Sequence, residues 1–270
     1  MRFGIFSSAL FVALLAASVV HAASNTFSLD EPDLISNKQL KIEGEIVLPD
    51  TPKWSAAFVL HGCDGITQWS RPVLEEHASF YRAHGFATVV LDSWQPRGLT
   101  NMCGASSPEA LEYLDPSVRV ADIETVTAYI ARLPGFDGKI IVDGVSHGGW
   151  VALSVLSSVG DEPIYAKVAG IVAWYPACGT IDTINKTPTL IFSGGKDANP
   201  YTQASACVEA AKNFNWIETI LFPEATHAFD YPYPAQVAGA SGLIRYDPTA
   251  KNAAYKRIDS WLREQGLTKP

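Results

Sequence analysis

Three residues that lie far apart in the sequence have side chains that could together cleave an ester-like carbonyl compound: Ser146, Asp197 and His227. A serine hydroxyl is a weak nucleophile at neutral pH, because almost none of it is ionised. An imidazole within hydrogen-bonding distance can take its proton, and a carboxylate can orient that imidazole and stabilise its charged form. These residue types therefore predict nucleophilic catalysis, provided that the fold brings them together.

The serine lies in the segment Gly144-Val-Ser-His-Gly148, which fits the pattern Gly-x-Ser-x-Gly. An apolar, β-branched run precedes this segment, and residues 150–156 that follow it suit a helix with an apolar face. A strand, a sharp turn and a helix in this order form a nucleophile elbow, whose strained turn projects the hydroxyl from the edge of a sheet. The flanking glycines omit side chains that would collide with neighbouring elements. The alternative is a glycine-rich loop whose serine only caps the helix.

The carboxylate and the imidazole each follow a predicted buried strand. Asp197 ends the segment 190–197 after a Gly-Gly turn, and His227 lies in the loop after the strand predicted at 217–222. Serine, acid and histidine in this chain order are the arrangement of the α/β-hydrolases. Each residue also has an ordinary alternative: Asp197 could cap the helix that begins near Pro200, and His227 could be a simple loop histidine.

A tetrahedral oxyanion needs donors of its own, which we expect from two backbone N–H groups. His147 directly follows the serine, so its N–H can face the substrate oxygen while its side chain points elsewhere. The other donor should come from the loop His61-Gly-Cys-Asp-Gly65, whose glycines allow a ligand close to the backbone, and we assign it to Cys63. We expect His61 to shape this loop rather than to act as the base.

Strands and helices alternate along almost the whole chain. The predicted strands are residues 38–48, 54–60, 86–91, 140–142, 167–175, 189–192 and 217–222, and the predicted helices are residues 69–84, 115–133, 150–156, 200–214 and 251–265. This alternation predicts a single α/β domain over residues 23–270, with a mostly parallel sheet that helices cover on both faces.

Other parts of the chain lack this regularity. Residues 24–37 are expected to be irregular, and residues 223–248, rich in Pro, Tyr and Gly, are expected to form an irregular insertion. His77 and His84 lie on the helix predicted at 69–84, where we expect surface or capping roles.

The first residues have the pattern of a secretory signal peptide. Met1-Arg2 is a short basic start, residues 11–20 are apolar, and Ala22 stands where a signal peptidase reads small residues. We therefore expect residues 1–22 to be removed, the mature protein to be secreted or periplasmic, and no stable membrane anchor to remain. An uncleaved anchor is the alternative, for which the apolar stretch is short.

The charge balance argues against polyanionic partners. The formal net charge is −8, and removal of Arg2 with the signal makes it one unit more negative. Because no Lys/Arg cluster stands out, nucleic acid and anionic membrane surfaces are not expected partners.

The chain has four cysteines, Cys63, Cys103, Cys178 and Cys207. An even number in an exported chain indicates two disulfides, for which three pairings exist. We favour Cys63–Cys103 and Cys178–Cys207, because each pair would tie neighbouring loops at one end of a sheet. A zinc site is the weaker alternative, since the chain has no Cys-x-x-Cys pair, and we expect no metal.

A set of motifs resembles the dienelactone hydrolase family, within the α/β-hydrolase superfold: residues 61–65, 91–98, 144–149, 195–197 and 226–229. The resemblance extends over most of the chain, roughly from Leu40 to Gly266. It implies hydrolysis of a small-molecule ester or lactone through an acyl-enzyme, with neither a metal nor an organic cofactor.

Two departures from the family pattern matter. The founding enzymes have a cysteine where this chain has Ser146, and a glutamate near the place of Gly62. Their narrow dienelactone substrate is therefore not carried over. Arg97 could bind a substrate carboxylate as a two-pronged pair, or it could stabilise its own loop. Trp94 could line the substrate pocket, or it could belong to the core.

These features together predict a secreted or periplasmic serine hydrolase that cleaves a carboxylic ester or lactone. An exported peptidase of the same superfold ranks lower, because no second domain that would restrict peptide access is evident. A binding protein that keeps the fold without turnover is the third candidate, and the complete set of three catalytic residue types argues against it.

Overall fold

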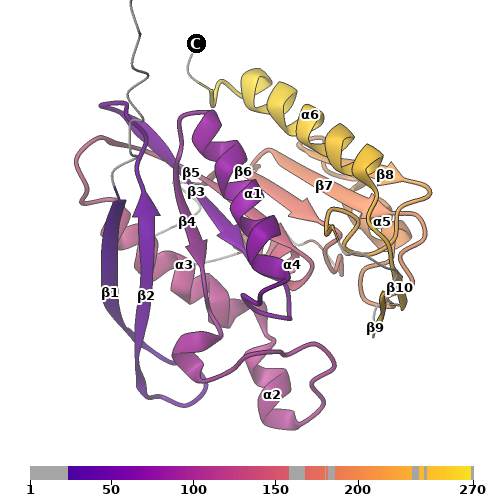
Figure 1. Ribbon diagram of the computed structural model, residues 1–270, viewed down its shortest axis with the longest axis horizontal. Helices are drawn as coiled ribbons and strands as arrows, with labels where there is room; N and C mark the ends of the chain where they lie inside the picture. The colour runs from indigo at the N-terminus through magenta and orange to yellow at the C-terminus, as the bar shows by residue number, and fades with distance from the viewer. Residues whose placement is uncertain are drawn as a thin grey trace, which may run out of the picture.

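The computed structural model describes residues 24–157, 168–179, 181, 186–232, 237–239 and 242–268. Its main sheet consists of β1 (Ser24–Pro32), β2 (Gln39–Val47), β3 (Trp54–Leu60), β4 (Ala87–Leu91), β5 (Phe136–Val145), β6 (Val168–Trp174), β7 (Thr189–Gly194) and β8 (Ile217–Phe222). These eight strands have the order β1-β2-β4-β3-β5-β6-β7-β8 (Figure 1). The pairings of β1 with β2 and of β2 with β4 are antiparallel, and all the others are parallel. The predicted mostly parallel sheet is thus confirmed.

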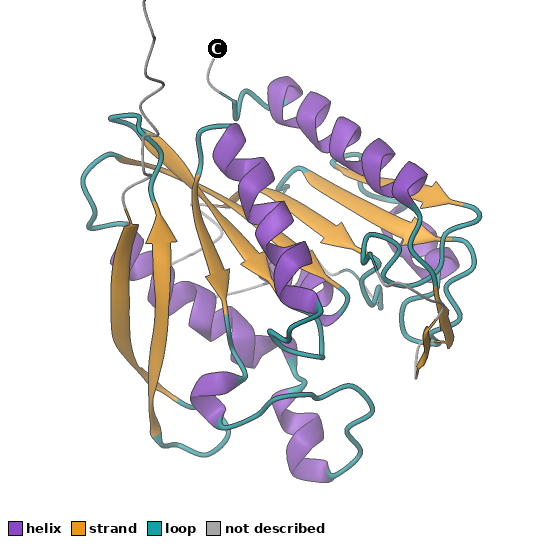
Figure 2. Cartoon of the chain, viewed as in Figure 1, coloured by secondary structure: helices purple, strands orange, loops and turns teal. Residues whose placement is uncertain are grey.

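Helices cover both faces of this sheet (Figures 1 and 2). On one face lie α1 (Ser70–Ala83) and α6 (Pro248–Glu264), and on the other lie α3 (Pro116–Ile130), α4 (His147–Ser154) and α5 (Ala204–Ala211). Side chains alternate along a strand, so Phe58 of β3 packs in the α3 layer and its neighbour Val59 in the α1 layer. Because both layers are apolar, all of β3 is buried, which explains its continuous apolar run.

Shorter elements complete the described part of the chain. They are the 3-10 helices η1 (Gln95–Arg97) and η2 (Val155–Ser157), the helix α2 (Pro108–Tyr113), and the strands β9 (Val237–Gly239) and β10 (Gly242–Ile244). The last two pair with each other as a separate antiparallel ladder within the segment expected to be irregular.

Two long helices begin with the same local signal, an aspartate followed by a proline. Asp115 accepts a hydrogen bond from Ser117 N–H at the start of α3, and Asp247 accepts from Thr249 and Ala250 N–H at the start of α6. A side-chain oxygen here satisfies N–H groups that have no partner in the helix, and proline at the next position lacks the N–H that would otherwise be unpaired.

The prediction of an irregular segment at 24–37 is wrong for residues 24–32, which form β1. This strand pairs with β2 from Ser24 to Pro32. Its alternation is hidden in the sequence because one inward position carries Glu31, whose side chain is buried beside Arg97.

The predicted signal peptide at 1–22 lies outside the described residues. No helix within the described ranges has the length and apolar character needed to cross a membrane.

Both disulfides have the pairing favoured above. Cys63–Cys103 joins the loop after β3 to the long loop after β4, and Cys178–Cys207 joins the loop after β6 to α5. Each bond therefore ties segments that follow the carboxyl ends of parallel strands.

Candidate active site

Ser146 lies in a strained turn between β5 and α4. Its φ of 54° is in the left-handed region, which is unfavourable for a residue with a side chain. Ser146 N–H donates to the Trp174 carbonyl at 2.9 Å, and Trp150 N–H donates to the Ser146 carbonyl at 3.1 Å. Hydrogen bonds on both sides of the serine thus hold the unfavourable conformation at the carboxyl end of β5.

The two glycines of the elbow allow contacts between backbones. A Cβ on Gly144 would stand 2.1 Å from the carbonyl oxygen of Gly148, and a Cβ on Gly148 would stand 2.5 Å from the carbonyl oxygen of Leu60. Side chains do not fit at such distances, so larger residues would push α4 away from β5 and β3. The pattern Gly-x-Ser-x-Gly is therefore a packing requirement in this fold.

Ser146, His227 and Asp197 form one hydrogen-bonded series. Ser146 Oγ lies 3.0 Å from His227 Nε2, and His227 Nδ1 lies 2.7 Å from Asp197 Oδ2. The three residues follow β5, β8 and β7, whose carboxyl ends share one edge of the sheet. When Nδ1–H donates to the carboxylate, Nε2 is left to accept the hydroxyl proton, which is the arrangement that a general base requires.

Partners other than the imidazole hold the Asp197 carboxylate in place. Thr202 Oγ1 donates to Oδ2 at 2.7 Å, and Asn199 N–H donates to Oδ1 at 2.9 Å. The nearby helix α5 begins only at Ala204 and has no side-chain cap. The geometry therefore favours the role of Asp197 beside His227 over the alternative of a helix cap.

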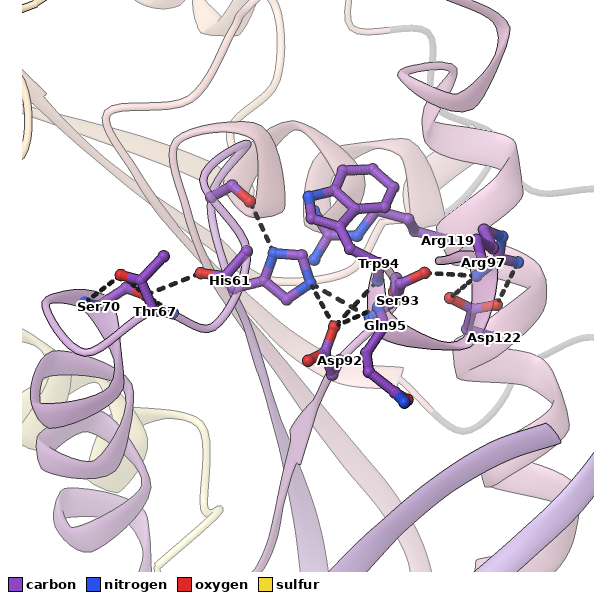
Figure 3. A network of polar contacts seen from close by, with 12 residues as sticks. His61, Thr67, Ser70, Asp92, Ser93, Trp94, Gln95, Arg97, Arg119 and Asp122 are labelled. Carbon is purple, nitrogen blue, oxygen red and sulfur yellow. Dashed lines mark hydrogen bonds and ion pairs between the residues drawn. The ribbon is translucent and has the colours of Figure 1, made fainter. Parts of the chain in front are cut away.

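His61 orients the peptide that carries the Cys63 N–H. Its Nδ1 lies 2.6 Å from the Gly62 carbonyl oxygen, and its Nε2 accepts a hydrogen bond from Ser93 N–H at 3.2 Å (Figure 3). Burial and the charge of Arg119 hold the pKa of His61 well below its usual value, so the ring is neutral, with one donor and one acceptor. Because C=O and N–H point in opposite directions in a trans peptide, this bond aims the Cys63 N–H away from His61.

His147 anchors the first turn of α4 through the two nitrogens of its ring. Its Nε2 lies 2.9 Å from the Leu114 carbonyl oxygen, and its Nδ1 lies 2.8 Å from Arg119 Nη1. Burial and the charge of Arg119 lower the pKa of His147 to about 3. The neutral ring then accepts a hydrogen bond from the guanidinium and donates one to the carbonyl, so both ring nitrogens have partners within the protein.

Trp94 lies inside the protein, beneath the loop that carries Cys63. Its Nε1–H donates to the Cys63 carbonyl at 3.2 Å, and the guanidinium of Arg119 lies 5.0 Å from its ring centroid (Figure 3). Only 1% of its surface is exposed. The geometry therefore favours the alternative of a core residue over a wall of the substrate pocket.

Arg97 is not placed to bind a substrate carboxylate. Its side chain is fully buried, and Nη2 and Nη1 lie 2.8 and 3.1 Å from the two carboxylate oxygens of Asp122 (Figure 3). Nη1 also donates to the Ser93 carbonyl at 2.7 Å, and carboxylates of Glu31 and Asp33 lie within 3.6 Å. A substrate would have to displace these partners, so Arg97 has the loop-stabilising role that we gave as the alternative.

A second buried polar series supports the loop that carries His227. His77 Nδ1 lies 2.8 Å from Asp143 Oδ1, and its Nε2 lies 3.1 Å from Asp230 Oδ2. Tyr175 donates its hydroxyl to Asp230 at 2.6 Å, and its ring packs against His227 with centroids 4.8 Å apart. The prediction of a surface or capping role for His77 is wrong, because two distant aspartates stabilise its buried charge and leave no local signal.

The sheet order and the hydrogen-bonded series of Ser146, His227 and Asp197 at the strand ends are those of an α/β-hydrolase fold. The chain belongs to the dienelactone hydrolase family, whose sequence profile matches residues 42–266, and is therefore a hydrolase. No curated protein matches it.

Solved structures of low sequence identity share the fold. A dienelactone hydrolase-like promiscuous phosphotriesterase from metagenomic libraries has a TM-score of 0.63 at 16% identity, over 90% of this chain and 99% of its own. A thermophilic esterase from Thermogutta terrifontis has a TM-score of 0.59 at 18% identity, over 93% of this chain and 95% of its own.

Replacement of Arg97 tests whether this residue stabilises the folded protein or binds the substrate. We expect Arg97→Gln to lower the free energy of unfolding by about 3–5 kcal/mol, because it leaves buried carboxylates without their cation. The KM for an anionic ester should change no more than the KM for a neutral one. Urea unfolding measures the first effect, and Arg132→Gln at an exposed position is the control, with a change within about 0.5 kcal/mol. A selective rise in KM for the anionic ester at unchanged stability would contradict this assignment.

The charge of His77 makes stability depend on alkaline pH. Burial alone would lower the pKa of His77, but Asp143 and Asp230 raise it from 6.5 to about 10. The stabilisation is therefore complete below pH 6.5 and is lost as the pH rises through about 10. His77→Gln should cost about 3–5 kcal/mol at pH 6 and less at pH 10. Denaturant unfolding at both values tests this, and equal losses at the two pH values would refute it.

Proposed function

We propose that this protein is a secreted or periplasmic serine hydrolase that cleaves a carboxylic ester or lactone through an acyl-enzyme. The observation that carries the proposal is the series in which Ser146 Oγ lies 3.0 Å from His227 Nε2 and His227 Nδ1 lies 2.7 Å from Asp197. Membership of the dienelactone hydrolase family supports the same reaction type.

In the first half of the reaction, Ser146 Oγ attacks the carbonyl carbon while His227 Nε2 takes its proton. Asp197 stabilises the imidazolium that forms. The carbonyl oxygen becomes an oxyanion, to which the N–H groups of Cys63 and His147 donate. When the tetrahedral intermediate collapses, the alcohol leaves with the proton from His227, and the acyl group stays on the serine. In a lactone, the leaving alcohol remains part of the same acyl chain.

In the second half, a water molecule takes the place of the alcohol. His227 accepts a proton from this water as the water oxygen attacks the acyl carbon. The second oxyanion is held by the same two N–H groups, and its collapse releases the acid and returns the proton to Ser146 Oγ. The two half-reactions together consume one ester and one water molecule and return the enzyme to its starting state.

A structural neighbour suggests a direct probe of the nucleophile. Esterase 2 from Thermogutta terrifontis has been solved phosphorylated by paraoxon, and it matches this chain with a TM-score of 0.57 at 19% identity, over 90% of this chain and 96% of its own. We extend this reactivity to Ser146, because a hydroxyl activated by an imidazole attacks an electrophilic phosphorus as it attacks a carbonyl.

Substitution of the nucleophile tests the proposal. Ser146→Ala should reduce the hydrolysis of p-nitrophenyl butyrate by about 10⁴–10⁶-fold, because the attacking oxygen is missing. Paraoxon should add one diethyl phosphate to the wild type and none to the variant, as seen by intact mass. Ser205→Ala, at an exposed position of α5, is the matched control with full activity. Circular dichroism verifies the fold, and turnover by folded Ser146→Ala, or no turnover by the wild type, would overturn the assignment.

We also propose export with cleavage after Ala22, which the two disulfides support. When the full chain is expressed in a Gram-negative host, the protein should appear in the periplasm. Its intact mass should be that of a chain that begins at Ala23 and has all four cysteines in disulfides. A chain without residues 2–22 is the control and should stay in the cytoplasm with reduced thiols. A full-length mass in the membrane fraction would instead show an uncleaved anchor.

A further inference from the structure

We propose that Asp64 makes this active site prefer esters that carry a positive charge near the scissile bond, such as quaternary ammonium esters. The inference rests on the proposed function of Ser146 and goes beyond it, because it names the charge class of the substrate.

The carboxylate of Asp64 and the nucleophile flank the same glycine. A Cβ on Gly62 would stand 2.9 Å from Asp64 Oδ1 and 3.5 Å from Ser146 Cβ. A single side-chain position thus separates the carboxylate from the serine. A cationic group attached within a few bonds of the ester carbonyl would therefore lie within Coulombic range of Asp64 when the carbonyl is at Ser146.

The loop that carries Asp64 is fixed on both sides, so the carboxylate has a defined place. Before it, Cys63 is bonded to Cys103, and the Cys63 carbonyl accepts from Met102 N–H at 2.8 Å. After it, the Gly65 carbonyl accepts from Ser70 Oγ at 2.7 Å. Figure 3 shows Thr67 and Ser70 at the start of α1, and His61 beside Ser93 and Trp94.

The negative charge of Asp64 is not cancelled by an ion pair within the described residues. Arg97 is fully engaged by Asp122. Arg119 is buried against His147 and Trp94, and it also faces Asp92 and Asp122. Arg119 acts on Asp64 only through space, as it does on Asp92 and Asp122, and it makes no ion pair with any of them within the described residues. Asp64 itself is half-buried and borders the nucleophile.

Three ionisable side chains from other elements face Asp64, and they determine how its charge depends on pH. They are His227 after β8, Arg119 on α3 and Tyr175 after β6. Burial raises the pKa of Asp64 to about 6, although its own N–H, His227 and Arg119 oppose this rise. The carboxylate is therefore charged at pH 8 and largely neutral at pH 5, so a preference that depends on it should fade as the pH falls through about 6.

The experiment uses substrate pairs that differ only in charge. On the alcohol side, butyrylcholine is compared with 3,3-dimethylbutyl butyrate. On the acyl side, the p-nitrophenyl ester of 4-(trimethylammonio)butyrate is compared with that of 5,5-dimethylhexanoate. In each pair a carbon replaces the quaternary nitrogen, and neither member titrates. The ratio of kcat/KM within a pair cancels every pH effect that is common to the two substrates, because both meet the same free enzyme.

The wild type should prefer the cationic member of at least one pair by about tenfold at pH 8, and by much less at pH 5. Asp64→Asn keeps the shape of the side chain and removes the charge, so it should reduce the ratio to about one at both pH values. Asp50→Asn, which removes the same charge at an exposed turn, is the control and should keep the wild-type ratio.

The outcomes separate this inference from the proposed function. If the neutral esters are hydrolysed in a Ser146-dependent way but neither pair shows a preference for the cation, the role of Asp64 is refuted and the hydrolase assignment stands. If Asp64→Asn slows both members of a pair equally, Asp64 only shapes its loop, and the inference is again refuted. If no ester is hydrolysed, the proposed function itself fails and the inference fails with it.

Discussion

The contact between the start of α4 and the ends of β5 and β3 is the constraint on which the active site depends. Gly148 lies so close to Leu60 and His61 that their carbonyl oxygens would stand only 2.5 and 2.6 Å from a Cβ. This approach places the serine and the N–H of His147 beside the loop that contains Cys63. The strained conformation of Ser146 persists because hydrogen bonds to both sides of the turn hold it against its local preference.

Two buried charge arrangements support the site from opposite sides. Arg97 and Asp122 hold the loop after β4, against which the loop of His61 packs. His77, Asp143 and Asp230 hold the loop after β8, where Tyr175 contacts the imidazole of His227. In both places a charge is buried only because opposite charges contact it directly. Such arrangements specify one geometry, since a small displacement would leave a charge without a partner.

The sequence predicts what local patterns encode. The parallel strands are continuous apolar runs, and Ser146, Asp197 and His227 each follow one of them. Because the carboxyl ends of parallel strands lie at one edge of the sheet, this pattern is enough to predict that the three side chains lie close together. The alternation of β1 is less visible, because Glu31 occupies an inward position that only its buried contacts, Arg97 among them, explain. The partners of His77 lie 66 and 153 residues away, and no local pattern indicates them. Asp64 is similar: its loop is recognisable, but the direction of its carboxylate follows from tertiary contacts.

The disulfide between Cys63 and Cys103 has a consequence for when the enzyme can work. It clamps the backbone segment that is expected to receive the developing negative charge of the reaction. A newly made chain in a reducing cytosol would lack this clamp, although its nucleophile and base could already meet. Under the export proposed above, oxidation after transport would complete this loop, so that one covalent bond would couple the formation of the proposed oxyanion site to departure from the reducing cytosol.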